Sequence, residues 1–277
     1  MPDDARDADT KAWLAGVFDR AAPTYDRVGD AYHDFFGELL VDLAAVGPGD
    51  SVLDVACGRG AALLPAARRV GGTGSLLGVD LSPEMVALAA RALADEGLPG
   101  EGRVMDAEHL GLGEASFDVA LCAFGLFFFP DPEAAVAEVF RVVRPGGTVA
   151  VSTWGPEDER WSWEDDLLAT LDAGRRAIVR PFDDATEIAA LLRGAGFTDV
   201  ACRLEEREVR FADEDAWWAW KWSYSLRGVL EQQDEATLER LRRDAAERMQ
   251  PHLEPTGLPC RLTANLVRAR RPDPVRR

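Results

Sequence analysis

Acidic residues stand at or near the ends of three short apolar segments of this 277-residue chain. Asp54 lies near the end of the first segment, Asp80 ends the second, and Asp106 follows the third. If the segments are parallel strands, their carboxyl ends meet at one edge of a sheet, where open α/β sheets bind ligands. A carboxylate at the end of the second strand commonly accepts hydrogen bonds from ribose hydroxyls. The spacing therefore predicts a nucleoside-binding edge.

The turn after the first segment indicates which kind of nucleoside is bound. A dinucleotide fingerprint would need glycines at 56, 58 and 61, but the chain has Ala56, Gly58 and Ala61. Asp54 would also repel a pyrophosphate, because two like charges about 4 Å apart cost about 4 kcal/mol at an effective dielectric constant of 20. A ligand with a ribose, an exocyclic amine and positive charge fits better. We therefore predict S-adenosylmethionine and disfavour a nicotinamide-dependent oxidoreductase.

The apolar segments alternate with amphipathic ones, which is typical of a parallel sheet covered by helices. Ser82 with Pro83, and Asp131 with Pro132, are helix-start signals. We expect strands at 51–55, 75–79, 102–105, 117–122, 148–153, 199–210 and 262–270, and helices at 13–18, 31–46, 60–70, 83–95, 132–143 and 184–195, with a helical insertion over 213–250. RPGG at 144–147 is expected to form a turn before the fifth strand.

Four stretches of the sequence together resemble class I S-adenosylmethionine-dependent methyltransferases. They are VLDVACGRG, GVDLSPEMVALA, MDAEHLGLGEASFDVALCAFGLFFFPD and EVFRVVRPGGTVAVSTW. The most similar branch is the ubiquinone/menaquinone-biosynthesis type with its natural-product-pathway relatives, and the likeness covers about residues 15 to 155. It implies an α/β fold with a Rossmann-like, seven-stranded, mostly parallel sheet, helices on both faces and an antiparallel last strand. It also implies an N-terminal helical lid and a helical insertion before the last strand.

The resemblance implies a division of the chain and a set of cofactor-binding residues. We expect a lid over 1–47, a cofactor-binding core over 48–155, and the rest of the same domain over 156–277, with the acceptor-side insertion at about 211–258. The expected cofactor-binding residues are Tyr25, Asp54, Ala56, Gly58, Gly60, Asp80, Leu81, Met85, Asp106, Ala107, Cys122 and Phe124. Asp54 would meet the cofactor's ammonium directly or through water, and Asp80 would accept from both ribose hydroxyls.

The remaining roles follow from the same resemblance. Leu81 and Met85 would pack on the adenine, while Asp106 would accept from its amine and the Ala107 amide would reach the ring. Cys122 to Phe124 would line the methionine side. Ala56 departs from the glycine more usual in the family, and Arg59 replaces a small polar residue without an evident role.

The acceptor side offers fewer signals. His33 lies in the segment expected to form the lid and is the best candidate for a general base, with Tyr25 beside it, although a histidine there is more often on the surface. His109 is expected to be structural. In DAWWAWKWSYSLRG, at 215–228, one tryptophan stripe at helical spacing predicts core, and the other predicts core, an acceptor pocket or a subunit interface. Of these we favour an aromatic-lined pocket. The predicted substrate pocket comprises Phe124, Trp154, Trp218 and Trp222.

The net charge of −18 disfavours nucleic acids and anionic membranes as partners. Four widely spaced cysteines, with no paired spacing, fit a reduced cytoplasmic protein better than a zinc site or a disulfide framework. We therefore expect a cytoplasmic methyltransferase acting on a small aromatic or polyketide-like metabolite, with no metal, and a homodimer is possible. The alternative with the same fold is a cyclase or scaffold that binds the cofactor without transferring its methyl group.

Overall fold

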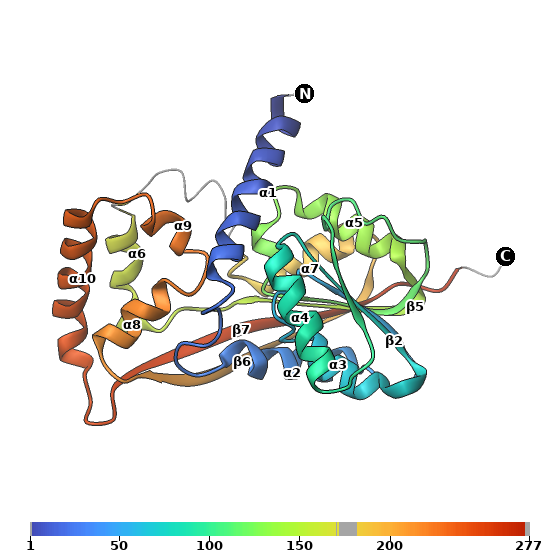
Figure 1. Cartoon of the computed structure of the whole chain (residues 1–277). Coiled ribbons are helices and arrows are strands. Elements are labelled where there is room, and N and C mark those ends of the chain that lie inside the picture. Colours follow the sequence, from blue (N-terminus) through green and yellow to red (C-terminus); the bar gives the residue numbers. More distant parts are fainter. Residues whose placement is uncertain (1, 170, 172–181, 275–277) are drawn as a thin grey trace.

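The computed structural model describes residues 2–169, 171 and 182–274. A seven-stranded sheet forms its centre, and helices pack around it (Figure 1). The strands are β1 (Ser51–Val55), β2 (Ser75–Asp80), β3 (Glu101–Val104), β4 (Phe117–Ala123), β5 (Val143–Trp154), β6 (Thr198–Phe211) and β7 (Leu258–Arg270). The helices are α1 (Pro2–Ala21), α2 (Tyr32–Ala44), α3 (Leu63–Val70), α4 (Pro83–Asp95), α5 (Pro132–Val142), α6 (Trp163–Leu168), α7 (Ala185–Gly194), α8 (Glu214–Lys221), α9 (Arg227–Leu230) and α10 (Glu235–Met249).

The strand order in the sheet is β3-β2-β1-β4-β5-β7-β6. β7 runs antiparallel to both β5 and β6, and the other pairs are parallel. The order reverses between β1 and β4, and ligands of such sheets bind beyond the strand ends at this point. The predicted fold class, with its antiparallel last strand, is confirmed.

Strand β1 is buried along its length because both faces of the parallel sheet are covered. Asp54 is the one charged residue in this strand, and it pairs in register with Gly78 of β2. A Cβ atom at Gly78 would lie 2.9 Å from the sulfur of Cys57. The glycine therefore allows the turn after β1 to pack directly on β2.

Helix α4 begins where its sequence signals predict. The Ser82 hydroxyl accepts a hydrogen bond from the Met85 amide at 3.1 Å, and Pro83 occupies the first helical position. Asp131 and Pro132 start α5 in the same way. The first of these starts follows directly on the end of β2 at Asp80.

The expected turn over 144–147 differs from the structure, in which β5 already begins at Val143. The register between β4 and β5 shifts between Phe117 and Val119, as at a β-bulge. A Cβ atom at Gly147 would lie 2.7 Å from the carbonyl oxygen of Asp118. The glycine therefore permits a close backbone approach within a strand. The prediction of a turn before the strand at 144–147 is wrong.

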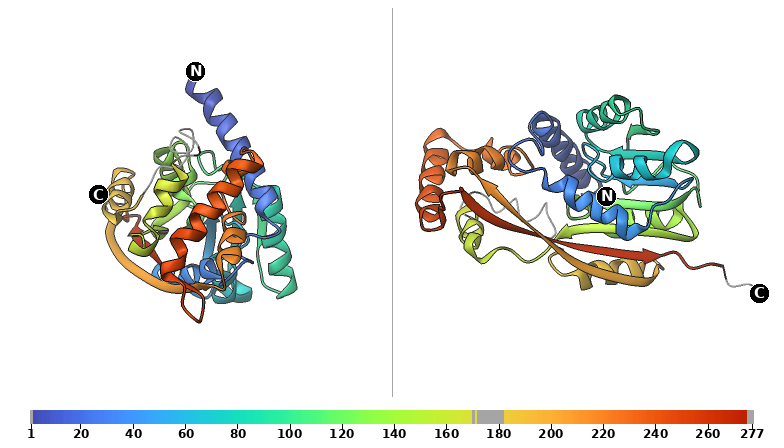
Figure 2. Two further views of the ribbon diagram at one scale, coloured as in Figure 1. Left: turned by 90° about the vertical axis from the view of Figure 1, so that its left-hand side faces the viewer. Right: turned by 90° about the horizontal axis from the view of Figure 1, so that it is seen from below.

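Strands β6 and β7 form a long ribbon that carries the helical insertion. They pair from Thr198 with Arg270 to Phe211 with Leu258. The chain between them forms α8, α9 and α10, which gather with α6 beyond one end of the sheet (Figures 1 and 2). This confirms the expected helical insertion before the last strand, while the proposed division into lid, core and remainder stays a prediction.

Helix α1 packs against α4 and α9. The Ser82 hydroxyl donates to a carboxylate oxygen of Asp19 in α1 at 2.6 Å, so α1 is tied to the start of α4. A Cβ atom at Gly228 of α9 would lie 2.5 Å from the Val17 side chain, which shows how closely these helices approach. Within the described ranges, none of the helices is both long and apolar enough to pass through a bilayer.

Candidate active site

A cavity of about 430 Å³ lies at the carboxyl ends of β1, β2 and β4, within the usual size range of small-molecule sites. Helix α1 contributes Lys11, Leu14, Ala15 and Phe18 to its wall. Most of the predicted cofactor residues line it, namely Tyr25, Ala56, Gly58, Asp80, Leu81, Met85, Asp106, Ala107 and Phe124. Three predicted residues, Asp54, Gly60 and Cys122, do not line it.

The turn after β1 has an unusual backbone. Ala56 and Gly58 both have positive φ angles, 55° and 52°. Glycine adopts this conformation freely, whereas alanine pays roughly 1–2 kcal/mol for it. The Gly58 amide donates to Asp80 at 2.9 Å, which fixes the turn over the end of β2. Gly60, at φ 103°, packs on Leu64 instead of facing the cavity.

Gly125 lies so close to Ala56 that it has no room for a side chain, and this gives a testable prediction. A Cβ atom at Gly125 would lie 2.5 Å from the Cβ atom of Ala56 and 3.1 Å from the sulfur of Cys122. We expect Gly125→Ala to lower the free energy of unfolding by about 1–3 kcal/mol through overpacking. Adding Ala56→Gly should restore most of that loss, because it removes the nearest atom and the positive-φ strain. Urea unfolding of the single and double variants measures both effects, and a double variant no more stable than Gly125→Ala would contradict the explanation.

Asp54 lies beneath the turn and is fully buried. Neither of its carboxylate oxygens makes a hydrogen bond of normal geometry with any described residue. Burial raises the pKa of Asp54 well above its usual range, the nearby charge of Asp80 raises it further, and the Leu63 amide acts weakly in the opposite direction. A buried carboxylate without a partner is costly, so this position favours a cationic ligand group close by.

Asp80 lines the cavity at the end of β2. Its two oxygens accept from the Gly58 and Ser82 amides, both at 2.9 Å. Burial raises the pKa of Asp80, and these backbone donors partly offset the rise. Ser82 caps α4 by itself, so the Asp80 carboxylate is not required as the helix cap. Its remaining lone pairs are available for two hydroxyl donors.

The far side of the cavity combines apolar and acidic groups. Leu81 and Met85 line it from the start of α4, and Ala107 and Asp106 line it beyond β3. Lys11 of α1, which the sequence reasoning missed, donates to Asp106 at 2.8 Å and also bonds Glu108. Burial opposes ionisation of Asp106, but the bonds from Lys11 and from the Glu108 amide prevail and lower its pKa. Helix α1 is thereby tied to the segment after β3, on the predicted adenine side.

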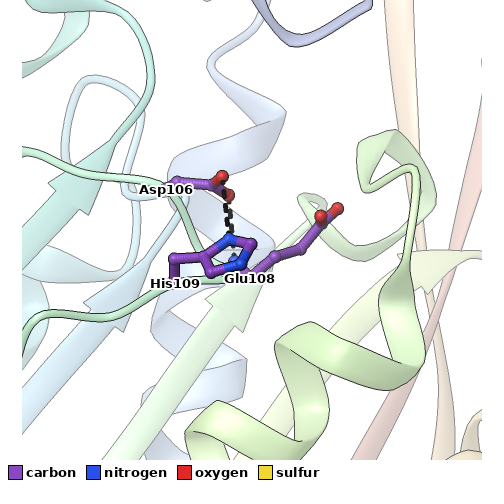
Figure 3. A group of neighbouring side chains, drawn as sticks. All are labelled: Asp106, Glu108 and His109. Carbon is purple, nitrogen blue, oxygen red and sulfur yellow. Dashed lines mark hydrogen bonds and ion pairs between the residues drawn. The ribbon is translucent and has the colours of Figure 1, made fainter. Parts of the chain in front are cut away.

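Asp106, Glu108 and His109 lie close together in Figure 3, and one ligand atom from each falls within 4.8 Å of the others. His109 contacts Asp106 at 3.5 Å, and its side chain is 80% exposed; its expected structural role stays a prediction. The Lys11 ammonium already lies against both carboxylates. The two carboxylates of the cluster therefore form an ion-pair site for Lys11 of α1.

Phe124 lines the cavity with a left-handed backbone, φ 55°. Cys122 differs from its predicted position, because Ala123 and Phe124 line the cavity whereas the Cys122 thiol is buried and does not. Successive residues of a strand point to opposite faces, so Cys122 and Ala123 lie on different sides of β4. Burial raises the pKa of the Cys122 thiol to about 12. It therefore stays protonated and unreactive at neutral pH.

His33 and Tyr25 both line the cavity, as the predicted catalytic pair. The structure corrects the expectation that a histidine here is exposed, since His33 is only 7% exposed. Its Nε2 atom lies 3.3 Å from the Tyr25 hydroxyl, and its Nδ1 atom lies 3.2 Å from Asp26. Asp26 follows Tyr25 directly in the sequence, but its contact with His33 was not predicted.

The structure differs from the predicted substrate pocket at three tryptophans. Trp218 and Trp222 pack against a small apolar cluster formed by Leu168, Leu226, Val229 and Leu230, away from the cavity wall. Trp154 lies behind Phe124, with 4.4 Å between ring centroids, and supports that ring without lining the cavity itself. Of the four predicted pocket residues, Phe124 alone reaches the cavity.

Arg59 connects the turn after β1 to the segment that follows α1. Its guanidinium donates to the Tyr25 carbonyl oxygen at 2.5 Å and lines the cavity. Burial lowers the pKa of Arg59, and the neighbouring charge of Arg27 lowers it further. The residue without an evident role in the sequence thus ties Tyr25 to the turn after β1 at the cavity wall.

Known proteins share both the sequence pattern and the fold. Residues 52–147 match the sequence profile of a methyltransferase domain. The chain is 34% identical over 228 residues to the nocamycin O-methyltransferase of Saccharothrix syringae, covering 76% of this chain and 81% of that protein. It is 30% identical over 206 residues to a ubiquinone/menaquinone biosynthesis C-methyltransferase of Cupriavidus pinatubonensis, covering 68% and 85%. The crystal structure of YcgJ from Bacillus subtilis shares the fold with a TM-score of 0.61 at 20% identity, covering 87% of this chain and 100% of that one.

A sheet with this strand order, a glycine turn after β1 and an acidic residue ending β2 define a nucleoside-binding α/β enzyme. The chain belongs to the S-adenosylmethionine-dependent methyltransferases. The site fits that cofactor: the buried carboxylate of Asp54 lacks a partner that an ammonium would supply, and the positive-φ turn allows close backbone approach. Asp80 offers acceptors for ribose hydroxyls beside it.

Proposed function

We propose that this enzyme methylates a small aromatic or polyketide-like natural product by in-line displacement. One observation carries the proposal: the cavity is lined both by the Asp80 carboxylate and by the rings of Phe18, Phe124 and Phe128. A nucleoside donor and a flat apolar acceptor would thus share one enclosed space. The relative named nocamycin O-methyltransferase supports a natural product as the acceptor.

The cofactor supplies a methyl group already activated by a positively charged sulfur. The protein then contributes alignment and exclusion of water. Asp80 would hold the ribose, and Met85 and Leu81 the adenine. Asp54, which does not line the cavity, would act on the ammonium from beneath the turn. The Lys11 contacts with Asp106 and Glu108 would keep α1 closed over the adenine side.

The test is transfer of labelled methyl groups. The purified protein is incubated with S-adenosylmethionine carrying a radioactive methyl group and with a panel of hydroxylated naphthalenes and anthraquinones. We expect label in at least one acceptor, with inhibition by S-adenosylhomocysteine. Label that never leaves the cofactor, although the cofactor binds, would favour a cyclase or scaffold. Binding of NAD without binding of S-adenosylhomocysteine, measured by calorimetry, would favour an oxidoreductase.

The partners follow from the same proposal. A small-molecule acceptor needs no nucleic-acid surface, and the net charge of −18 disfavours one. A cytoplasmic location and a homodimer stay predictions. Cell fractionation and the molar mass in solution measure them directly.

A further inference from the structure

A chain of three polar side chains lies along one wall of the cavity. Asp26 bonds Nδ1 of His33 at 3.2 Å, and Nε2 of His33 lies 3.3 Å from the Tyr25 hydroxyl. All three residues line the cavity, yet the side chains of His33 and Asp26 are only 8% and 9% exposed. A buried carboxylate, an imidazole and a hydroxyl in this order resemble the working parts of a general base and its positioning group.

We propose that His33 is the general base for methyl transfer to oxygen and that Asp26 is the residue that positions it. The inference deepens the proposed function and rests on it. A carboxylate beside Nδ1 accepts a hydrogen bond from that nitrogen and so favours the tautomer with its proton on Nδ1. The lone pair of the neutral imidazole is then on Nε2. Tyr25 shares that lone pair through a long hydrogen bond, which an acceptor hydroxyl can replace.

The surroundings of the His33 ring hold it in one orientation. The ring centroid lies 4.2 Å from that of Tyr32, 5.1 Å from that of Tyr25 and 5.4 Å from that of Phe124. Phe124 contributes a left-handed backbone to this arrangement, and Asp26 has one too, at φ 51°. Non-glycine residues held in that region are often part of a functional site, which is consistent with a carboxylate aimed at the ring.

Other charged groups nearby do not replace Asp26. Asp34 and Arg59 line the same cavity, but the carboxylate that lies at hydrogen-bond distance from His33 Nδ1 and can accept from it belongs to Asp26. Burial raises the pKa of Tyr25 well above its usual range, and the charges of Asp26 and Asp80 raise it further. Tyr25 therefore stays neutral and acts as a hydrogen-bond donor, which leaves His33 to take the proton.

The proposed step moves a methyl group from sulfur to the acceptor oxygen. The acceptor oxygen forms a bond to the methyl carbon while the bond from that carbon to sulfur breaks, and the electron pair of the broken bond stays on sulfur. The hydroxyl proton passes to Nε2 of His33, and the Asp26 carboxylate stabilises the imidazolium. Solvent removes the proton after product release. No oxidant, reductant or metal enters the reaction.

The pair also defines the chemical class of the acceptor. A general base is needed where the acceptor is neutral, as in a phenol, an enol or an alcohol. A carboxylate is already ionised at neutral pH and has no proton to give up. The acceptor inferred here is a neutral hydroxyl on a flat apolar ring system.

The kinetic test uses naphthols with electron-withdrawing substituents, whose hydroxyl acidities differ. We expect His33→Gln to lower kcat by about 100- to 10,000-fold and Asp26→Asn by at least about 10-fold, with little change in KM. The loss in His33→Gln should shrink as the naphthol becomes more acidic. Asp30→Asn, an exposed residue between the two in sequence and outside the cavity, is the matched control and should keep wild-type kcat.

A second test needs no acceptor. The chain has three histidines, so the ring nitrogens of His33 can be assigned in a ¹⁵N spectrum by comparison with His33→Gln. With S-adenosylhomocysteine bound, we expect His33 to carry its proton on Nδ1, and Asp26→Asn to reduce that tautomer while the affinity for S-adenosylhomocysteine stays within threefold. Wild-type protein with the proton on Nε2 would overturn the assignment of Asp26.

Failure of the two proposals can be told apart. If the wild type transfers label to no acceptor, the proposed function fails, and the ¹⁵N spectrum still decides the Asp26–His33 pairing. If the wild type methylates a naphthol but both variants keep kcat within twofold, the general base fails alone. Methylation of a naphthoic acid at its carboxylate, with none of a naphthol, would also overturn the inferred acceptor class.

Discussion

Asp54→Asn is expected to make the protein's stability less dependent on pH and to weaken its binding of S-adenosylhomocysteine. Asp54 is fully buried, its oxygens have no normal hydrogen bond to a described residue, and burial raises its pKa well above the usual range. Asparagine has nearly the same shape but no charge. The substitution thus removes the titration and leaves the packing in place.

The sign of the pH effect follows from proton linkage. The pKa of Asp54 is higher in the folded wild type than in the unfolded state, where it lies near 3.8. The contribution of Asp54 to the free energy of unfolding is therefore fully present below about pH 4. It falls as the pH rises towards the pKa of Asp54 in the folded state. Asp54→Asn lacks this fall. Its free energy of unfolding, relative to that of the wild type, should therefore rise by up to about 1.4 kcal/mol for each pH unit in that interval.

The measurements are urea unfolding of both proteins without cofactor at pH 5 and pH 8, and calorimetry with S-adenosylhomocysteine. We expect the affinity to fall by about 10- to 100-fold, since a bond from a cationic donor to a carboxylate contributes about 1.5–3 kcal/mol. Asp118→Asn, at the opposite end of the sheet, should leave the affinity unchanged. Equal pH dependence in wild type and Asp54→Asn would show that Asp54 titrates normally.

Local signals in the sequence predicted the framework well. Helix α4 runs from Pro83 to Asp95 as expected, because Ser82 and Pro83 form a start signal that needs no distant partner. Strand β1 is a short apolar run between glycine-containing turns, and its bounds also agree. Parallel strands place their carboxyl ends at one edge of the sheet. The predicted strands were therefore enough to predict that the acidic residues gather at that edge.

Contacts between distant segments could not be predicted in the same way. Lys11 and Asp106 are 95 residues apart, and nothing local in either segment indicates the pair. Trp218 and Trp222 pack on the same apolar cluster, and their spacing could not show that this cluster lies away from the cavity, because that depends on how α8 docks. Cys122 lies near the end of β4 and does not line the cavity, although the next two residues, Ala123 and Phe124, do.

The largest effect on cofactor binding is expected from Asp80→Ala. The carboxylate of Asp80 lines the cavity and is the acceptor proposed for both ribose hydroxyls. Losing two hydrogen bonds to a charged acceptor, each worth about 1.5–3 kcal/mol, should reduce affinity for S-adenosylhomocysteine by at least about 100-fold. Calorimetry measures the change.

The fold should survive this substitution, because Ser82 caps α4 independently of Asp80. The Gly58 and Ser82 amides each lose an acceptor, so we expect the free energy of unfolding to fall by about 1–3 kcal/mol. Asp80→Asn, whose side-chain oxygen can still accept from one of these amides, should be more stable than Asp80→Ala yet bind almost as poorly. Asp95→Ala removes the same charge at the exposed end of α4 and should bind normally. Since the ribose acceptor is the feature on which the cavity was assigned to a nucleoside, wild-type affinity in a folded Asp80→Ala protein would remove that assignment.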